Sequence, residues 1–257
     1  MKHVNRLLGA WTVLVLIFFY LPIAVLIGFS FNTSRLNILW EGFTLQWYAA
    51  LWHDGPLVQS LGNSLIVAVI TTAISVLLGT GGAWLLYRHR FPRVRLLMIL
   101  VLTPMIIPEV IMGVSLLMLF VTIGLELGYA TIIISHVTFC FPFVLVAVQA
   151  RLRGLDPSLE EAALDLGATP AGAFRRVLVP YLMPAIVSGA LMAFTLSLDE
   201  LIVTYFTASA ATRTLPLEIF GRIKKGLDPT LNAISTIFIL STVILVLSAE
   251  FVRRRRA

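Results

Sequence analysis

The chain alternates between long apolar runs and shorter polar segments. A helix needs about 20 residues to cross a hydrocarbon core of about 30 Å. Six apolar runs have 18 to 28 residues, which is close to that length or above it, and they cover residues 11–30, 62–87, 96–123, 130–150, 181–206 and 231–248. Backbone amides inside lipid must be hydrogen-bonded internally, so each run predicts a transmembrane helix, the third of them interrupted by Pro104 and Pro108. The pattern indicates an all-α membrane protein with six transmembrane helices, in which residues 1–257 form one transmembrane domain.

The first run, residues 11–30, could also be the apolar part of a signal peptide. It is long for that role, and Ser30-Phe31-Asn32 is a poor cleavage site, so we expect an uncleaved first helix. A short helix on the membrane surface is expected after it, because apolar and aromatic residues recur there at helical spacing. These residues are Leu45, Tyr48, Ala49 and Trp52.

Composition and charge agree with a membrane protein and predict its orientation. The chain is 59% hydrophobic and 12% charged, whereas a soluble domain is about a quarter charged. With a cytoplasmic N-terminus, 14 of the 19 Lys and Arg residues fall on the cytoplasmic side, in residues 1–10, 88–95, 151–176 and 253–256. The positive-inside rule therefore predicts that both termini are cytoplasmic. The net charge of +6 reflects this orientation, and we expect no nucleic-acid partner.

The residue inventory argues against several kinds of chemistry. Cys140 is the one cysteine, so no disulfide can form within the chain and no cysteine metal cluster is expected. The sequence has no Walker A pattern, since Lys225-Gly226 has the wrong order and context. We therefore predict a non-enzymatic chain without a metal site, a cofactor or an ATP site of its own.

A compact polar stretch separates the fourth and fifth runs, and it predicts a helical hairpin at residues 156–176, called the polar hairpin below. Asp156-Pro157-Ser158 is a good helix start, with Asp as N-cap and Pro in the first turn. Gly167 permits a turn, and Thr169-Pro170 starts a second short helix that runs through Phe174. On these residues alone, an ordinary cytoplasmic hairpin is also possible.

The spacing within and after this hairpin resembles the EAA loop of binding-protein-dependent ABC importer permeases. Glu161-Ala162-Ala163 is followed by Gly167 and then by Val177 and Pro180, with Val177 and Val179 in place of the commoner Ile and Leu. The resemblance implies a type I ABC importer permease fold in the cell inner membrane. It also implies coupling to a separate ATPase dimer, which would bind ATP and Mg, through Glu161, Ala162, Ala163, Leu164, Gly167 and Pro180.

Three acidic residues interrupt the apolar runs: Glu109, Asp199 and Glu200. A charge in a transmembrane helix costs about 2.5–3.5 kcal/mol and normally faces a cavity or a partner. No basic residue lies in the runs, so the partner that we predict is a cationic cargo. On a continuous helix Thr195 and Phe206 share the face of Asp199, and an aromatic ring beside a carboxylate suits an ammonium group. The alternative is that these acids reach the outer interface or bond loop amides.

A second resemblance narrows the family to the second permease subunit of spermidine/putrescine importers. It rests on Phe194 to Glu200 with Phe206, and on Ser30-Phe31-Asn32, Phe43-Thr44, Trp47-Tyr48, residues 136–140 and Leu215-Pro216-Leu217. It implies a polyamine cargo, a sister permease subunit and an extracytoplasmic solute-binding protein. Glu200 and Glu109 stand where these permeases more often have Asp, so another cationic or amine-containing solute, such as an opine or an amino-acid derivative, remains the alternative.

Two other classes of function are compatible with a six-helix chain. One is a secondary transporter or channel that works without an ATPase, although the sequence has no convincing internal repeat of the kind such transporters carry. The other is a scaffold subunit that transports nothing. His136 stands alone on an apolar helix, and we predict a structural hydrogen bond for it rather than a proton relay.

Overall fold

The computed structural model describes residues 2–35, 39–89, 91–156, 158–225 and 229–255. Within these ranges it does not describe the side chains of residues 2–6, 160, 225 and 245–255. Several residues used in the sequence predictions lie outside the described residues: Arg90, Pro157, Gly226, Arg256 and Ala257. The chain divides into two compact units, one made of Met1–Gln59 with Glu218–Leu247 and the other of Ser60–Leu217 with Ser248–Ala257.

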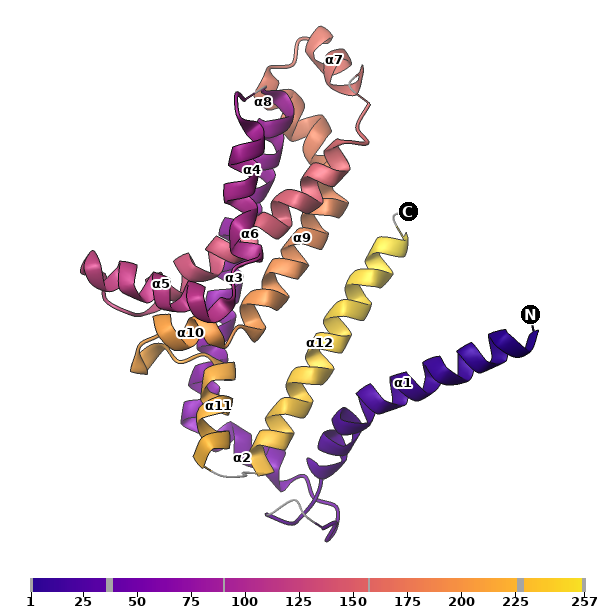
Figure 1. The fold of residues 1–257 in the computed structure, drawn as a ribbon, viewed down its shortest axis with the longest axis vertical. Coiled ribbons are helices and arrows are strands. Elements are labelled where there is room, and N and C mark those ends of the chain that lie inside the picture. The colour runs from indigo at the N-terminus through magenta and orange to yellow at the C-terminus, as the bar shows by residue number, and fades with distance from the viewer. Residues whose placement is uncertain (1, 36–38, 90, 157, 226–228, 256–257) are drawn as a thin grey trace. The chain divides into compact units, whose positions relative to one another are not determined.

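The first unit contains helices from both ends of the chain (Figure 1). They are α1 (Lys2–Phe29), α2 (Gln46–His53), the start of α3 (Gly55–Arg88), most of α11 (Leu215–Lys225) and most of α12 (Pro229–Arg255). The short helix predicted from the spacing of residues 45–52 is confirmed as α2. The polar segment between the fifth and sixth apolar runs, residues 207–230, also contains a helix, α11.

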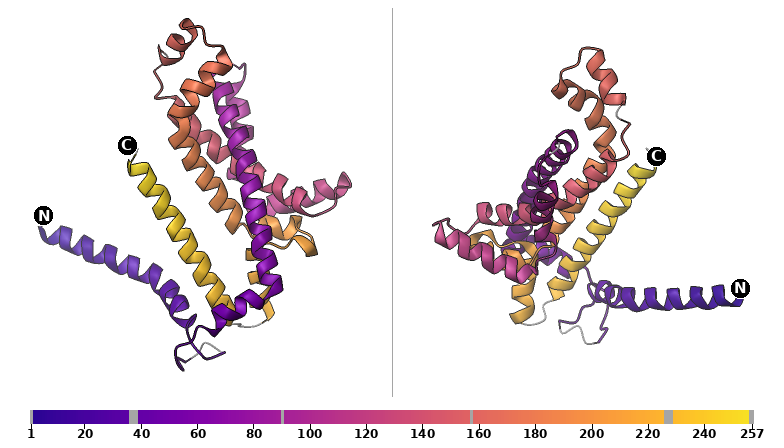
Figure 2. Two further views of the ribbon diagram at one scale, coloured as in Figure 1. Left: turned by 180° about the vertical axis from the view of Figure 1, so that it is seen from behind. Right: turned by 45° about the horizontal axis from the view of Figure 1, so that its top comes forward.

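The second unit holds the remaining helices. They are α4 (Val94–Leu102), η1 (Thr103–Met105), α5 (Glu109–Thr122), α6 (Tyr129–Leu152), α7 (Ser158–Asp165), α8 (Pro170–Ala173), η2 (Phe174–Leu178), α9 (Val179–Asp199), α10 (Ile202–Thr207) and η3 (Ala210–Thr212). Here α6 and α9 pack along each other, while α5 packs on α10 (Figure 2). The predicted all-helical fold is confirmed over the described residues. An isolated antiparallel β-bridge joins Asn32 and Phe43.

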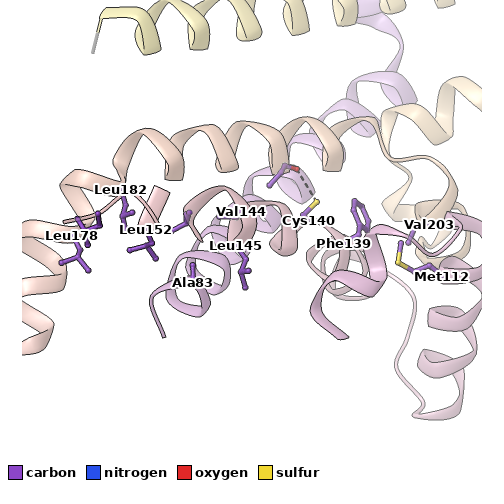
Figure 3. Close-up of a cluster of buried hydrophobic side chains, with 13 residues drawn as sticks. Ala83, Met112, Phe139, Cys140, Val144, Leu145, Leu152, Leu178, Leu182 and Val203 are labelled. Carbon is purple, nitrogen blue, oxygen red and sulfur yellow. Dashed lines mark hydrogen bonds between the residues drawn. The ribbon is translucent and has the colours of Figure 1, made fainter. Parts of the chain in front are cut away.

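The core of the second unit follows the contact between α6 and α9, with α3 and α10 adding to it (Figure 3). Val144 of α6 lies at a point where three helices approach closely. A Cβ on Gly79 of α3 would lie 2.7 Å from Val144 Cβ, and one on Gly189 of α9 would lie 3.1 Å from Val144 Cα. Small residues allow this approach, as is common where transmembrane helices pack.

The third apolar run is a broken helix. The axes of α4 with η1 and of α5 differ by 102°. Pro104 lies within η1, and Pro108 is the N-cap of α5 with an extended ψ of 130°. Proline lacks a backbone N–H and disfavours helix in the residue before it, so two prolines four residues apart end one helix and start another. The interruption expected at these prolines is therefore a sharp bend between two separate helices.

The fifth run also departs from a continuous helix. After α9 ends at Asp199, Glu200 takes an extended conformation with φ −69° and ψ 119°. The chain resumes as α10 at Ile202. The expectation that Phe206 shares one helical face with Asp199 was wrong, because the two residues belong to different helices. No proline or glycine marks this break, so local propensity did not reveal it. Residues 199–201 are called the acidic break below.

Several helices have the length and composition of membrane spans. Four do so alone, namely Leu7–Phe29, Gly55–Arg88, Tyr129–Leu152 and Pro170–Asp199, and the bent pair of α4 and α5 makes a fifth if counted as one span. Pro229–Ile244 is a shorter apolar helix within the sixth predicted run. The sequence predicted six transmembrane helices, and the described residues contain up to five candidate spans and this shorter apolar helix.

Candidate functional site

The polar hairpin is built from local capping interactions that the sequence predicts. Asp156 Oδ1 accepts the backbone N–H of Ser158 at 3.0 Å, as an N-cap does, and this bond holds the pKa of Asp156 below its usual value. Thr169 Oγ1 accepts the N–H of Gly172 at 3.1 Å and caps α8 in the same way. Both helix starts are thus confirmed, and each depends on residues within three positions of its cap.

Gly167 makes the turn between α7 and α8. Its φ is +85°, a left-handed conformation that costs a residue with a Cβ about 1–2 kcal/mol. The N–H of Gly167 donates to Leu164 O at 2.9 Å, and the N–H of Ala168 donates to Ala163 O at 3.0 Å. This pair of bonds is a Schellman motif, which satisfies the last carbonyls of α7. The turn predicted at Gly167 is confirmed.

The hairpin presents its tip away from the rest of the second unit (Figure 2). Glu161, Ala162 and Gly167 are exposed, while Ala163 and Leu164 are half-buried. Sequence reasoning missed Leu166, whose side chain is 90% exposed at the end of α7. The position of this apolar residue, directly before the C-capping glycine of a polar helix, could have indicated that its side chain is exposed. Pro180 is exposed but lies in the first turn of α9, beyond the π-helix η2, so it is not part of the tip.

Aromatic contacts fix the base of the hairpin to the helix bundle. The ring of Phe174, in η2, lies 4.5 Å from the ring of Trp84 in α3. The Arg151 guanidinium lies 4.4 Å from the centre of the Tyr181 ring, and the Tyr181 hydroxyl donates to Gly154 O at 3.0 Å. A force on the hairpin would therefore reach α3, α6 and α9 through packed side chains.

The acidic break lies at the other end of α9, whose 21 residues span about 30 Å. Glu200 is 8% exposed, and its Oε1 accepts the backbone N–H of Val203 at 2.7 Å. Its carboxylate therefore caps α10 rather than pointing away from the protein. Glu200 thus bonds a nearby backbone amide, which was the alternative to a cationic partner for this acid.

Glu109 is exposed and occupies the first position of α5, where the helix dipole favours a negative charge. One turn further along α5, Gly113 packs against α10, since a Cβ there would lie 2.7 Å from Phe206 Cδ2 and 3.3 Å from Val203 Cα. Residues four apart share a helix face, so Glu109 faces the start of α10. Asp199 and Glu200 lie directly before that start, at the end of α9 and at the residue after it. The fold thus gathers all three predicted acids.

Asp199 is the exposed acid at the end of α9. Thr195 lies one turn before it, is also exposed, and donates its hydroxyl to Leu191 O at 2.9 Å. Phe206 is half-buried over Gly113, and the exposed ring on α10 is that of Tyr205, at 55%. Within the described part of the chain, no ion pair involves Asp199, Glu200 or Glu109.

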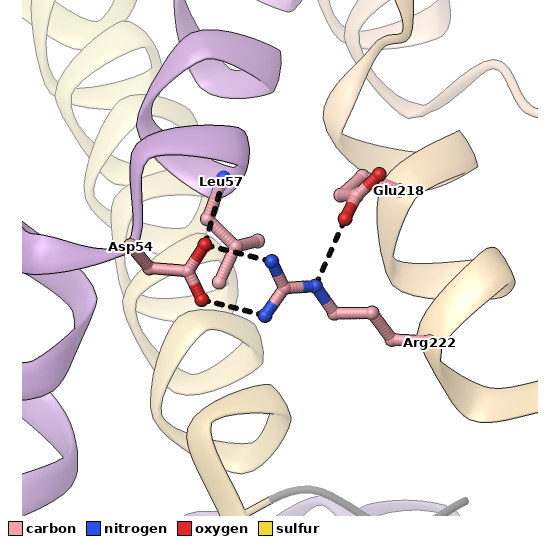
Figure 4. A network of polar contacts seen from close by, with 4 residues as sticks. All are labelled: Asp54, Leu57, Glu218 and Arg222. Carbon is pink, nitrogen blue, oxygen red and sulfur yellow. Dashed lines mark hydrogen bonds and ion pairs between the residues drawn. The ribbon is translucent and has the colours of Figure 1, made fainter. Parts of the chain in front are cut away.

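A second polar network, in the first unit, was not predicted (Figure 4). Arg222 of α11 donates from both terminal nitrogens to Asp54, at 2.6 and 2.7 Å, and from Nε to Glu218 at 3.0 Å. The hydrogen bond from Arg222 lowers the pKa of Asp54, and that bond in turn raises the pKa of Arg222. This paired arginine joins α11 to the turn before α3, so we read it as structural.

Comparison with known proteins decides the family. The profile of the binding-protein-dependent transport system inner membrane component matches residues 72–257. The chain belongs to this family. The match contains both the polar hairpin and the acidic break, so the family expected from the hairpin is confirmed.

The permease is similar along its length to two proteins of Escherichia coli K12. It is 37% identical over 252 residues to the spermidine/putrescine transport system permease protein PotC, covering 98% of this chain and 96% of PotC. It is 38% identical over 250 residues to the putrescine transport system permease protein PotI, covering 93% and 89% respectively. The narrower resemblance seen in the sequence is confirmed.

Solved structures confirm the fold. A chain of a bacterial ABC transporter involved in the import of the acidic polysaccharide alginate matches with a TM-score of 0.72 and 17% identity, covering 97% of this chain and 96% of that one. A chain of the MetNI methionine ABC transporter matches with a TM-score of 0.66 and 19% identity, covering 81% and 98%. The permease therefore has the type I ABC importer fold, and its family is that of multi-pass inner membrane components.

Proposed function

We propose that this chain is the permease subunit of an ATP-driven importer of polyamines such as spermidine and putrescine. The observation that carries the proposal is the exposed carboxylate of Asp199, which has no ion-pair partner among the described residues and stands at the opposite end of α9 from the hairpin. An ammonium group of the cargo would supply the missing positive charge. The names of the two similar Escherichia coli permeases support the same class of cargo.

The three acids take different parts in this proposal. Asp199 contacts the cargo, Glu109 adds negative potential from the start of α5, and Glu200 holds the backbone of the break through its bond to Val203. The exposed ring of Tyr205 replaces Phe206 as the aromatic partner for an ammonium group. Thr195, exposed one turn from Asp199, lines the same face.

The permease works as one subunit of a larger complex. Its partners are a sister permease, an ATPase dimer that binds ATP and Mg, and an extracytoplasmic solute-binding protein that delivers the amine. ATP-driven closure of the dimer moves the polar hairpin, through the exposed Glu161, Ala162 and Leu166. The contact between Phe174 and Trp84 passes that motion to α3, and the bundle changes which side is open. This chain itself binds no ATP and has both termini in the cytoplasm.

Uptake by the reconstituted complex tests the proposal. Proteoliposomes that contain the permease with its partners should accumulate radiolabelled spermidine when ATP is inside and the binding protein outside. Unlabelled putrescine should compete, whereas glycine betaine and a neutral amino acid should not. Failure of spermidine and putrescine to enter, in a complex that hydrolyses ATP, would overturn the polyamine assignment.

A second candidate cargo is another amine-containing solute, such as an opine or an amino-acid derivative. The observation that favours it is Glu109, which is exposed at the first position of α5. Its side chain is longer than that of the Asp expected in polyamine permeases, so it changes the space left for the cargo. Adding an unlabelled opine to the competition experiment separates the two candidates, because under the second candidate the opine would compete better than putrescine. Co-purification of an ATPase with this chain separates both from a secondary transporter or a scaffold.

A further inference from the structure

His136 of α6 is completely buried and connects the two helices that flank the acidic break. Its Nδ1 lies 2.8 Å from Ser197 Oγ, near the end of α9. Its Nε2 lies 2.9 Å from Thr204 Oγ1, in the first turn of α10. A single imidazole therefore hydrogen-bonds α9 on one side of the break and α10 on the other.

The remaining bonds fix where each proton lies. Thr204 Oγ1 donates its one proton to the backbone carbonyl of Glu200 at 3.1 Å. It must therefore accept from His136, so Nε2 carries a proton. A neutral imidazole then has a lone pair on Nδ1, which accepts the hydroxyl proton of Ser197. The three donors in this series of hydrogen bonds are thus matched by three acceptors, and the last acceptor is the backbone carbonyl of Glu200 in the break.

These hydrogen bonds stabilise the backbone conformation of the acidic break, which local sequence propensity does not specify. Glu200 leaves the helical conformation without a neighbouring glycine or proline, so its carbonyl loses the helical N–H that would otherwise bond it. Thr204 supplies the replacement donor, and the Glu200 carboxylate caps the next helix. The far end of α10 is also tied to α6, because Thr131 Oγ1 donates to Thr207 O at 2.7 Å.

We propose that His136 is a positioning residue for transport: its neutral imidazole holds α9 and α10 in register across the break and so directs the Asp199 carboxylate toward the cargo. The proposal rests on the function proposed above for Asp199. His136 does not touch the cargo, since its side chain is 0% exposed and both ring nitrogens are occupied by hydroxyls of this chain. This also argues against a proton relay, which needs a ring nitrogen with access to a donor outside the network.

The first test compares His136→Leu with His136→Gln. A glutamine amide offers an acceptor and a donor at a spacing close to that of the two ring nitrogens, whereas leucine fills the space with neither. At saturating spermidine, His136→Leu should lower uptake per assembled complex at least tenfold, and His136→Gln should keep more than a third of it. Basal ATP hydrolysis should be unchanged in both, because the polar hairpin lies at the other end of α9.

Thr204 gives an independent pair of variants if the leucine variant does not assemble. Thr204→Val removes the hydroxyl at nearly constant volume, and Thr204→Ser retains it. Thr204→Val should lower uptake severalfold while Thr204→Ser stays near the parent. Thr138→Val is the matched control on α6, because the bond that the Thr138 hydroxyl makes within the described part of the chain is to Ile134 O, at 2.8 Å, in its own helix. Equal uptake by the Val and Ser variants, or by the Leu and Gln variants, would overturn the positioning role.

A spectroscopic measurement separates this proposal from the polyamine assignment. In the complex with ¹⁵N-histidine in this chain alone, His136 should give one unprotonated Nδ1 signal and one protonated Nε2 signal, identified by their loss in His136→Gln. That signature does not require any cargo. If spermidine is not transported but the signature is present, the assigned cargo fails. If spermidine is transported and Nδ1 is protonated, the hydrogen-bond chain is wrong and the positioning role fails with it.

Discussion

The polar hairpin and the acidic break stand at the two ends of α9 and are held in shape by different means. Every backbone bond that defines the hairpin joins residues no more than five positions apart, as in the Schellman pair at Gly167. The break depends on His136, which is 61 residues from Ser197 and 68 from Thr204. A locally specified element can move as a unit, whereas a break tied to its neighbours is held in place.

This difference suits the tasks proposed for the two regions. The hairpin must follow an ATPase through a stroke, and its exposed tip is attached to the bundle by contacts such as that between Phe174 and Trp84. The break must present a carboxylate in one direction. Variants at the break should therefore change uptake without changing basal ATP hydrolysis, and variants at the hairpin should weaken the link between the two activities.

The largest expected effect is that of Asp199→Asn at the break. A charged hydrogen bond is worth about 1.5–3 kcal/mol, which corresponds to about a tenfold to hundredfold loss of polyamine uptake. Assembly should be normal, because the parent carboxylate has no ion-pair partner among the described residues. Uptake per assembled complex should fall more for spermidine than for putrescine, because spermidine has more ammonium groups to neutralise.

Glu126→Gln is the matched control for this charge, since Glu126 is an exposed carboxylate in the loop before α6. It should leave uptake of both amines unchanged. Poor assembly of Asp199→Asn with normal uptake by the complexes that do form would instead indicate a structural salt bridge to another subunit.

The next largest effect concerns the turn of the hairpin. At a φ of +85°, a β-branched side chain strains the turn at Gly167, while Asn adopts this conformation more readily. Gly167→Val should reduce amine-stimulated ATP hydrolysis severalfold, and Gly167→Asn should reduce it less. Among the described residues, apart from the neighbours of Gly167 in sequence, no atom lies within 4 Å of a Cβ at this position, so the bundle should assemble normally in both. Full stimulation in Gly167→Val would show that the turn does not contribute to coupling.

Gly113→Ala tests the close approach of α5 to α10. The new methyl would meet Phe206 Cδ2 at 2.7 Å and Val203 Cα at 3.3 Å, and overpacking of this kind costs about 1–3 kcal/mol. We expect a lower melting temperature of the complex and a modest loss of uptake, because Glu109 moves away from the break. Gly81→Ala is the control, since a Cβ at Gly81 would meet no atom of another described segment within 4 Å. Equal melting temperatures would show that α5 does not press on α10.

Much of the hairpin could be predicted from the sequence, and much of the break could not. Asp156, Gly167 and Thr169 act within a few residues of their position, so their types and spacing were enough. The acids at 199 and 200 were visible as charges in an apolar run, but their different roles were not. Whether a carboxylate caps a helix or stays exposed depends on where the helix ends, and that end is held by Thr204 and His136 from elsewhere in the chain.

The remaining misses have similar causes. The helix α11 was not predicted because residues 207–230 are polar, yet Arg222 bonds Asp54, a residue 168 positions away. Leu166 was overlooked because a single exposed leucine has no periodicity. Tyr205 was passed over for Phe206 because a continuous helix had been assumed across the break.

The smallest expected effect is in the first unit, outside both regions. Asp54→Asn should destabilise the complex by about 1 kcal/mol or less near pH 7. The hydrogen bond from Arg222 lowers the pKa of Asp54, so its stabilising contribution is present above the ordinary value of 3.8 and is lost as the pH falls through the lower folded value. Parent and variant should therefore differ in thermal stability at pH 7, and the difference should shrink as the pH falls below about 3.8. Glu41→Gln, which removes an exposed carboxylate of the same unit, is the control variant for the loss of a surface charge.

Photoaffinity labelling of the assembled complex tests most directly whether a cationic cargo passes the acidic break. A spermidine derivative with a photoreactive group would be supplied through the binding protein during ATP turnover, and the labelled peptides of this chain would be identified by mass spectrometry. We predict that label falls within residues 195–206, that excess spermidine removes it and that glycine betaine does not. Label confined to other segments, or label at 195–206 that persists in excess spermidine, would contradict the claim.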